Sequence, residues 1–470
     1  MFSVLLGVCL VFLFSVMGCG RDRPKTEGPP ASGKDRNGPT STVPSIPAAE
    51  GVLSSTTLLA TIDAGEKVVV AGSHGAPEGF SGLLFSEQGK GVAYIAEKDD
   101  LFRVVHNGGR GKLYKHIEGL VISPDGSRTA YVAAVGEKWC IAADGKEGRL
   151  FDGVGTPRFS PDSRHILYNA ADRGQGHLVV DGTVSASFPS SWDELFSGDS
   201  KKVISIQNSA DHDTVHRVVI YDLSLKKLWE KELNAILFVF NKARNRIAAI
   251  GLVNGMQQLV EFSLDNPDTV NKGQVYKEIH GHSFGPDGVS VAYAADKGEK
   301  LAVVLNGKEE MLPDGARADQ PVVRPDGKAA GIILADKGGF FFHQAFVSGG
   351  RKPKKYQEAG QPVYSSDGKG YAYIARQDQR FFVVVSGKEG PVFDMVVTPM
   401  FSPDGKYLVY RARKDGKRFV VVADAIGKTV SQHPAYEQVF QPVFTDDGKS
   451  VAYGVKDGNK LVWKVEKLEK

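Results

Sequence analysis

The sequence is poor in cysteine, carries no large excess of charge and has no long apolar run after its first residues. Only three cysteines occur in 470 residues, and Cys9 lies inside the N-terminal apolar run, so no internal disulfide framework is predicted. Lysine and arginine total 58 against 55 acidic residues. A formal charge of +3 on so long a chain offers no basic stripe for a phosphate backbone, and no nucleic-acid partner is expected.

Motifs for cofactors and metals are also absent. There is no EF-hand loop, phosphate-cradling glycine motif or haem-attachment sequence, so no cofactor and no metal are predicted. Two groups of residues lack the spacing of a metal site, and we interpret them as solvated loop residues. They are His280 with His282, and Asp211, His212, Asp213 and His216.

One stretch matches a catalytic motif by letter. Gly281-His282-Ser283-Phe284-Gly285 fits Gly-x-Ser-x-Gly, the nucleophile elbow, which needs a strand, a sharp turn and a helix. Here a Pro-Asp-Gly turn and a strand-like segment follow instead. We therefore predict no catalytic serine. Cys140 lies in an apolar triplet and is interpreted as a small core residue rather than a reactive thiol.

The N-terminus has an apolar run from Val4 to Met17 that ends at Val16-Met17-Gly18-Cys19. This tetrapeptide resembles the lipobox of bacterial lipoproteins, and the resemblance implies cleavage before Cys19 and lipidation of that residue. An ordinary secretory signal peptide and a short membrane anchor are the alternatives. Gly20 follows Cys19, which by analogy with the family favours the outer membrane. The protein would then be periplasmic and held at the membrane only through its lipid anchor.

Three parts of the chain are predicted on this basis. Residues 1–18 form the signal peptide, and residues 19–50 form the lipidated cysteine and a tether rich in proline, glycine and serine. Residues 51–470 form the folded body.

The body contains an internal repeat that is clearest at Phe401-Ser402-Pro403-Asp404-Gly405. Ser-Pro-Asp-Gly suits a tight turn between two strands, and later Asp-Gly and Asn-Gly pairs punctuate two further hairpins. The first residue of the motif recurs every 37 to 44 residues, and its ten occurrences define the first to the tenth repeat in chain order. They are Phe85, Ile122, Phe159, Phe196, Phe240, Phe284, Val323, Tyr364, Phe401 and Phe444.

These residues resemble the TolB-type (WD-like) propeller repeat. The resemblance covers about residues 80 to 466 and implies an all-β β-propeller of about ten four-stranded blades. It weakens in the fourth and fifth repeats, where Gly198-Asp199-Ser200 and Lys242-Ala243-Arg244 replace the motif. Ten repeats form either one large ring or two smaller rings, and the absence of a linker between repeats favours one ring.

The last repeat has only three predicted strands. The apolar stretches Thr57 to Ile62 and Lys67 to Val70 precede the first repeat and can supply the fourth strand. The N-terminal segment is therefore expected to complete the last blade and cover its edge, closing the ring.

Polar residues just before the inner strands should surround the mouth of the central channel. Because this end of the blades varies most between repeats, it is our candidate recognition face. The candidate residues are Thr156, Trp192, Asp193, His280, His282, Gln320, Gln361, Thr398 and Gln441. The alternative is that these groups only cap strand ends.

The resemblance and the missing catalytic signatures lead to one preferred function. The chain is predicted to be a monomeric, non-enzymatic platform that binds other proteins of the cell envelope, as the TolB resemblance implies. Two alternatives remain open. One is a module that binds glycan or peptidoglycan, and the other is a propeller-type lyase or glycosidase.

Overall fold

The computed structural model describes residues 53–69, 82–209, 214–348 and 353–468. The chain divides into two units, Met1–Ala48 and Ala49–Lys470, and all described residues belong to the second. This unit is all-β, and its described residues contain no α-helix. Accordingly, the described part of the chain offers no helix with the length and apolarity to cross a membrane.

Strands recur in the same order in each repeat, and the inner strand comes first. Inner strands, some split in two, are β2 Lys67–Val68 with β3 Leu83–Phe85, β7 Ile117–Ile122, β11 Gly153–Val154 with β12 Arg158–Phe159, β16 Ser191–Phe196, β23 Glu278–Phe284, β27 Arg317–Ala318 with β28 Val322–Val323, β31 Glu358–Ala359 with β32 Val363–Tyr364, β36 Met395–Phe401, and β40 Gln438–Val439 with β41 Val443–Phe444. Second strands are β4 Val92–Lys98, β8 Thr129–Val135, β13 Ile166–Asp172, β17 Lys202–Asn208, β20 Arg246–Val253, β24 Val291–Asp296, β29 Ala330–Asp336, β33 Tyr371–Gln377, β37 Tyr407–Lys414 and β42 Ser450–Asp457.

Third and outer strands follow. Third strands are β5 Leu101–His106, β9 Lys138–Ala143, β14 Gln175–Val180, β18 Val215–Asp222, β21 Met256–Ser263, β25 Leu301–Leu305, β30 Gly339–Ala345, β34 Arg380–Val385, β38 Lys417–Asp424 and β43 Lys460–Lys467. Outer strands are β6 Gly109–Arg110, β10 Lys146–Glu147, β15 Thr183–Val184, β22 Asn271–Tyr276, β26 Lys308–Met311, β35 Lys388–Glu389, β39 Thr429–Gln432 and β1 Leu53–Thr61, and β19 Lys227–Phe240 serves two repeats.

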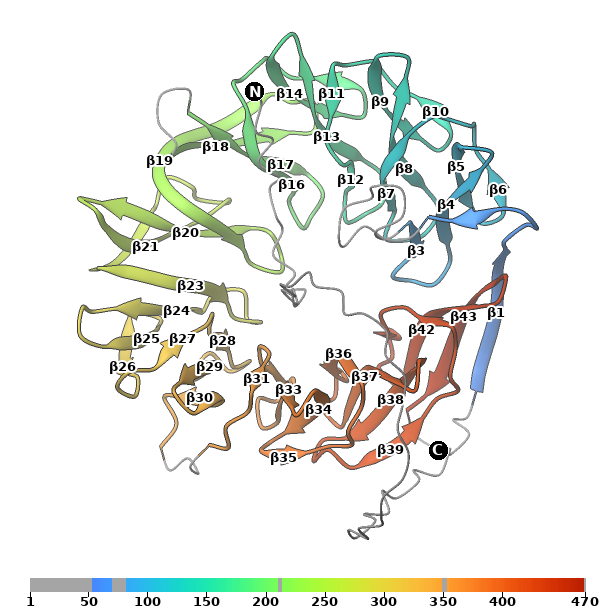
Figure 1. Cartoon of the computed structure of the whole chain (residues 1–470). Coiled ribbons are helices and arrows are strands. Elements are labelled where there is room, and N and C mark those ends of the chain that lie inside the picture. The colour runs from blue at the N-terminus through green and yellow to red at the C-terminus, as the bar shows by residue number, and fades with distance from the viewer. Residues whose placement is uncertain (1–52, 70–81, 210–213, 349–352, 469–470) are drawn as a thin grey trace, which may run out of the picture. The chain divides into compact units, whose positions relative to one another are not determined.

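All strand pairs between neighbours are antiparallel, and the sheets are arranged as in a β-propeller (Figure 1). Inner strands such as β7, β12, β16 and β36 point toward the centre of the unit, while β10, β26, β35 and β39 lie at its rim (Figure 1). The expected all-β class and four-stranded repeat are present in the described residues.

The fourth and fifth repeats do not form separate blades as expected. They share one sheet of seven strands, β16 to β22, because β19 runs without a break from the outer position of one repeat to the inner position of the next. Its first half pairs with β18 and its second half pairs with β20. The two repeats are therefore joined through a common backbone strand.

The N-terminal strand β1 pairs with β43 of the last repeat, with Thr57 opposite Trp463. This is the pairing expected for the stretch from Thr57. The second stretch behaves differently from the prediction, because Lys67–Val68 pairs with β4 and belongs to the first repeat. Without Lys67–Val68, the inner strand of the first repeat would consist only of β3.

The core lies between neighbouring sheets. Phe151, which is fully buried, packs with Val132 of the second repeat and Tyr168 of the third. An equivalent cluster contains Ala60 and Leu461 from the last sheet and Tyr94 from the first repeat. Cys140 is buried as predicted, and burial raises the pKa of its thiol.

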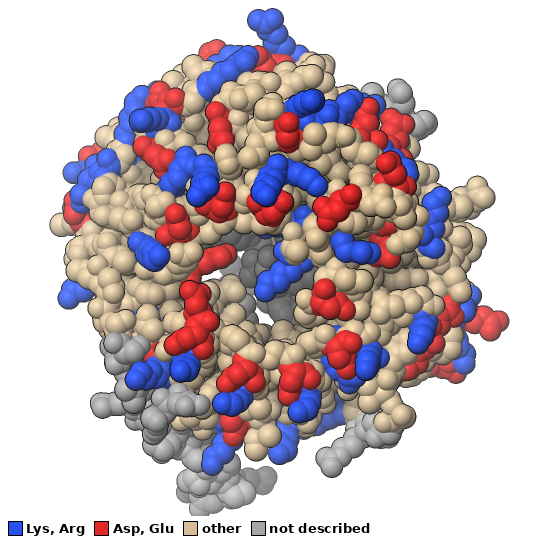
Figure 2. Space-filling view, turned by 180° about the vertical axis from the view of Figure 1, so that it is seen from behind, with Lys and Arg blue, Asp and Glu red and all other residues tan. Residues whose placement is uncertain are grey.

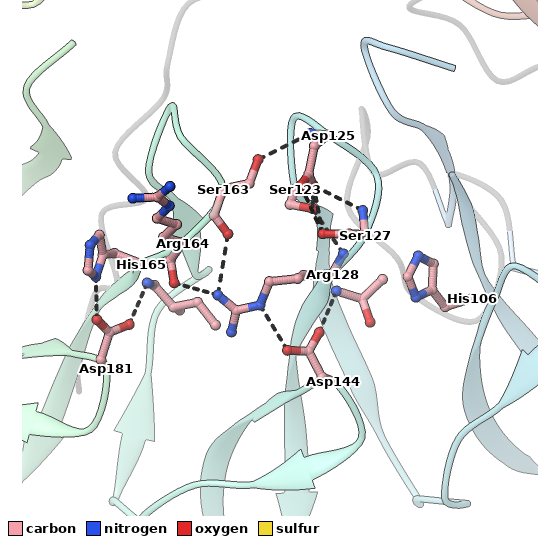
Figure 3. Close-up of polar contacts among 12 residues, drawn as sticks. His106, Ser123, Asp125, Ser127, Arg128, Asp144, Ser163, Arg164, His165 and Asp181 are labelled. Carbon is pink, nitrogen blue, oxygen red and sulfur yellow. Dashed lines mark hydrogen bonds and ion pairs between the residues drawn. The ribbon is translucent and has the colours of Figure 1, made fainter. Parts of the chain in front are cut away.

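The motif residues are used for turns, as expected. In the second repeat the Ser123 hydroxyl donates to Asp125 at 2.7 Å and accepts the backbone N–H of Arg128 at 3.0 Å (Figure 3). The hydrogen bond from Ser123, together with those from Ser127, lowers the pKa of Asp125 to about 2. The same hydroxyl-to-aspartate bond is present at Ser160 and Ser402.

A second recurring contact holds the turn that follows the third strand. Asp144 has a φ of 50° and Gly145 a φ of 78°, as a two-residue hairpin turn requires. The Asp144 carboxylate accepts the backbone N–H of Thr129 and the guanidinium of Arg128 (Figure 3). Asp181 and Asn306 accept the N–H of the second strand in the same way.

Candidate functional site

Every inner strand is interrupted just before the motif. Five of them are split into two short strands, and the others contain a register shift at the same place. Such interruptions re-aim side chains and release backbone groups from the ladder. The residues three positions before the motif's first residue define what we call the mouth ring. They are Gly82, Gly119, Thr156, Asp193, Leu237, Gly281, Gln320, Gln361, Thr398 and Gln441.

The next residue along the chain explains the interruption. It is proline in five repeats, namely Pro157, Pro321, Pro362, Pro399 and Pro442. Proline cannot donate a backbone N–H, so it is tolerated where the ladder is already broken. The sequence therefore encodes the mouth locally in half of the repeats.

Most of the predicted polar candidates belong to this ring. Thr156, Gln361 and Gln441 are exposed. Gln320 is half-buried and donates its amide N–H to the His282 carbonyl at 2.7 Å. The side-chain amide nitrogen of Gln361 lies 3.5 Å from the side-chain oxygen of Gln320. Thr398 lies within β36, but its side chain is outside the described part of the structure.

Asp193 is half-buried and paired rather than free. Its carboxylate lies 2.7 Å from the guanidinium of Arg158 in the preceding repeat. The neighbouring Glu194 is buried, and burial raises the pKa of its carboxyl group. The Asn169 amide lies 3.4 Å from the Glu194 carboxylate, so this part of the mouth is a connected polar network.

Trp192 is the exposed member of an aromatic cluster. Its ring lies 4.9 Å from that of His216 and 5.9 Å from that of Phe238, and 39% of its surface is exposed. His216 is buried and donates its ring Nδ1–H to the Ala235 carbonyl at 2.8 Å, and burial lowers its pKa. The cluster therefore presents Trp192 on a buried aromatic base.

Leu237 is a mouth-ring residue that the sequence analysis missed. It has the same spacing as the other ring residues, but a criterion that selects polar side chains does not identify it because leucine is apolar. Its φ is +51° and 46% of its surface is exposed. A left-handed backbone costs a residue with a side chain about 1–2 kcal/mol, so the structure holds this leucine outward at an energetic cost.

The placement of His282 contradicts the prediction. It is buried, with one ring nitrogen 3.2 Å from the Ala248 carbonyl, and burial lowers its pKa to about 4. The bulge in β23 turns it toward the fifth repeat instead of the mouth. His280 is half-buried and lies with Glu278 and Asp296, whose ligand atoms are within 4.8 Å of one another.

Ser283 lies in strand β23 and donates its hydroxyl to the Pro321 carbonyl at 2.6 Å, so the stretch is an inner strand and not a nucleophile elbow. Cys19 and residues 211–213 lie outside the described residues.

No protein-family model matches this chain, and no curated protein matches it. Solved structures similar to it include the "eukaryotic initiation factor", with 13% identity, 75% of this chain and 96% of that chain covered, and a TM-score of 0.46. The beta-propeller domain of the Trilobed protease from Pyrococcus furiosus has 11% identity, coverage of 60% and 95%, and a TM-score of 0.35. TolB from Acinetobacter baumannii has 16% identity, coverage of 58% and 78%, and a TM-score of 0.30. At these values none of them carries a functional argument to this chain.

Proposed function

We propose that this chain is a protein-binding β-propeller of the bacterial cell envelope that captures its partner at the mouth ring. The observation that carries the proposal is that the mouth ring and its chain neighbours hold both exposed apolar side chains, Trp192 and Leu237, and exposed amides such as Gln361 and Gln441. A ring that offers an aromatic anchor and, in other repeats, groups that hydrogen-bond a backbone is suited to a peptide segment with an apolar side chain. The proposal is for binding without turnover.

The architecture that would carry this role is a single ring of the ten repeats, with the fourth and fifth joined in one sheet, closed by β1. Three features support it. The β1–β43 pairing supplies the last sheet with a strand from the N-terminal side, and the cluster of Ala60, Leu461 and Tyr94 joins the last sheet to the first repeat. Phe85 also packs against Trp463, with ring centroids 6.1 Å apart.

Export and lipidation at Cys19 belong to the same proposal and have their own test. Cells expressing the full chain are labelled with a fatty-acid probe. The wild type should take up label and Cys19→Ala should not. Equal labelling of both proteins would remove the anchor from the proposal while leaving the mouth untouched.

The mouth is tested by site-specific photo-crosslinking in cells. A photoreactive amino acid replaces Leu237 in one protein and the exposed Ile426, which lies in a hairpin of the ninth repeat, in the control. We expect a discrete protein adduct at position 237 that disappears with Trp192→Ala. Equal adducts at both positions, or no effect of the tryptophan substitution, would overturn the proposal.

A second candidate function is glycan binding, because the exposed Trp192 ring is the kind of platform that a sugar can stack on. A polysaccharide pull-down with the wild type and Trp192→Ala distinguishes it. Retention that depends on Trp192, without a protein adduct at position 237, would favour the glycan over the protein partner.

A further inference from the structure

A cavity of about 720 Å³ lies at the opposite end of the sheets from the mouth ring, among the turns that carry the motif. Its walls come mainly from the turns of the fourth and fifth repeats, and Glu87 and Pro161 contribute from two other turns. This volume is in the range of small-molecule sites. We call it the turn-end cavity.

The cavity coincides with the loss of the repeat motif. Lys242-Ala243-Arg244 stands where four repeats have Pro-Asp-Gly, so the fifth repeat replaces a turn carboxylate with two cations. Arg244 has a φ of +47°, at the position where the second repeat has Gly126. An arginine in the left-handed region is strained, and strain of this kind is often retained at functional sites.

The backbone N–H of Asp199 lacks the acceptor that two other repeats supply, as do the N–H groups of Asp287, Asp326 and Asp404 among the described residues. In the second repeat the N–H of the motif aspartate, Asp125, donates to Ser163 of the following repeat at 3.1 Å (Figure 3). In the third repeat Asp162 donates to Ser200 at the same distance. The equivalent donor in the fourth repeat is the N–H of Asp199. Its serine partner is replaced by Arg244, and this N–H has no acceptor among the described residues.

The charges that line the cavity are three cations and three carboxylates. Asp199 accepts the Ser197 hydroxyl at 2.6 Å, and Asp265 lies 3.5 Å from the ammonium of Lys202. Lys242, Arg244 and Glu87 have no side-chain partner among the described residues. Two cations and one carboxylate are therefore left for a ligand.

On the face of the molecule that Figure 2 shows, charges of both signs are intermingled. Figure 2 shows Lys and Arg side chains alternating with Asp and Glu around the central hollow of one face, without a continuous patch of either sign. A small ligand suits such a surface better than a polyanion, because a polyanion would meet carboxylates at every step.

We propose that the turn-end cavity binds a small molecule through an anionic group, a phosphate or a carboxylate, held by Arg244, Lys242 and the N–H of Asp199. The unpaired Glu87 then faces the rest of the molecule and favours hydroxyl or amino groups there. Arg244 supplies a planar fork that fits either oxyanion, and Lys242 supplies a second charge. This site is independent of the partner at the mouth ring.

The test is isothermal titration of the full-length protein with inorganic pyrophosphate and with citrate, at an ionic strength kept constant with sodium chloride. The informative variant is Arg244→Ser, because Ser163 and Ser200 hold the same backbone position in neighbouring repeats. A serine here can accept the N–H of Asp199, so the variant should fold. Lys406→Ala, in the turn of the ninth repeat, is the matched control.

We expect saturable binding of one or both probes to the wild type and to Lys406→Ala. Arg244→Ser should weaken it by about tenfold or more and Lys242→Ala by about threefold to tenfold, as expected for loss of a charged hydrogen bond. Preference for pyrophosphate would identify a phosphate ligand, and preference for citrate a carboxylate ligand. Binding that survives in Arg244→Ser, or no binding of either probe at millimolar concentration, would overturn the proposal.

Discussion

The second and third repeats and the fourth and fifth repeats have the same strand order but join their neighbours differently. The regular pair is held by identical contacts, such as Asp125 to Ser163 and Asp144 to Thr129. The irregular pair shares β19, and the N–H of Gly198 donates to the Ala243 carbonyl at 3.1 Å. The repeated contacts thus stabilise the sheets. The exposed Trp192 and the turn-end cavity both lie in the fourth and fifth repeats, which depart from the repeat motif, and they lie at opposite ends of the sheets.

The largest expected difference comes from removing one aromatic side chain from each pair, a buried one and a partly exposed one. Phe151→Ala, between the second and third repeats, should lower the free energy of unfolding by about 3–5 kcal/mol, because the side chain is fully buried. Trp192→Ala, in the fourth repeat, should lower it by less than about 1 kcal/mol, because Trp192 is partly exposed. Denaturant unfolding measures both, and equal losses would contradict the division between stability and function.

Two buried glutamates should respond to pH with opposite sign. In the last repeat Glu466 lies 2.9 Å from His433 and accepts the Tyr453 hydroxyl at 2.6 Å. Burial opposes its ionisation, yet the contacts with His433 hold the pKa of Glu466 below its usual value. Its contribution is therefore present at neutral pH and is lost as the pH falls through the folded-state pKa.

Glu194 behaves in the opposite way, because burial raises the pKa of its carboxyl group. Its ionised form opposes folding at neutral pH, and this cost disappears as the pH falls. We expect Glu466→Gln to lower the free energy of unfolding at pH 7 by about 3 kcal/mol and Glu194→Gln to raise it. Denaturant unfolding at pH 7 and pH 4 checks both signs, and a destabilised Glu194→Gln would refute the second.

Restoring the motif proline in the fourth repeat should destabilise the protein. Gly198→Pro removes the N–H that donates to Ala243, and a Cβ at this position would overlap the Ala243 carbonyl oxygen. The free energy of unfolding should fall by about 3 kcal/mol. Pro161→Gly, at the same position of the third repeat, is the control and should cost less than about 1 kcal/mol. Thermal unfolding measures the loss of stability in both variants. An unchanged stability of Gly198→Pro would mean that the turn around Ala243 moves to accommodate the proline.

The smallest expected effect is a gain in stability. Arg244→Gly relieves the left-handed backbone at this position and should raise the free energy of unfolding by about 1 kcal/mol. Denaturant unfolding measures the gain. No gain would mean that Arg244 makes compensating contacts, and the strain argument for the turn-end cavity would fail.

Much of the fold could be predicted from the sequence. The repeat, its turns and the pairing of the Thr57 stretch with the last hairpin follow from adjacent residues and from counting strands. The candidate site was predicted in part: the spacing located the mouth ring, but polarity was the wrong criterion for Leu237, and His282 is turned inward by a bulge.

What the sequence by itself determined is local, because a Ser-Pro-Asp-Gly turn is stabilised by hydrogen bonds within a few residues. What only the tertiary structure decided depends on contacts between repeats that lie about forty residues apart. The common strand β19, the approach of Gly198 to Ala243 and the turn-end cavity that Lys242 and Arg244 line all belong to this second class. Each depends on which neighbour faces it, and the residues of one repeat do not contain that information.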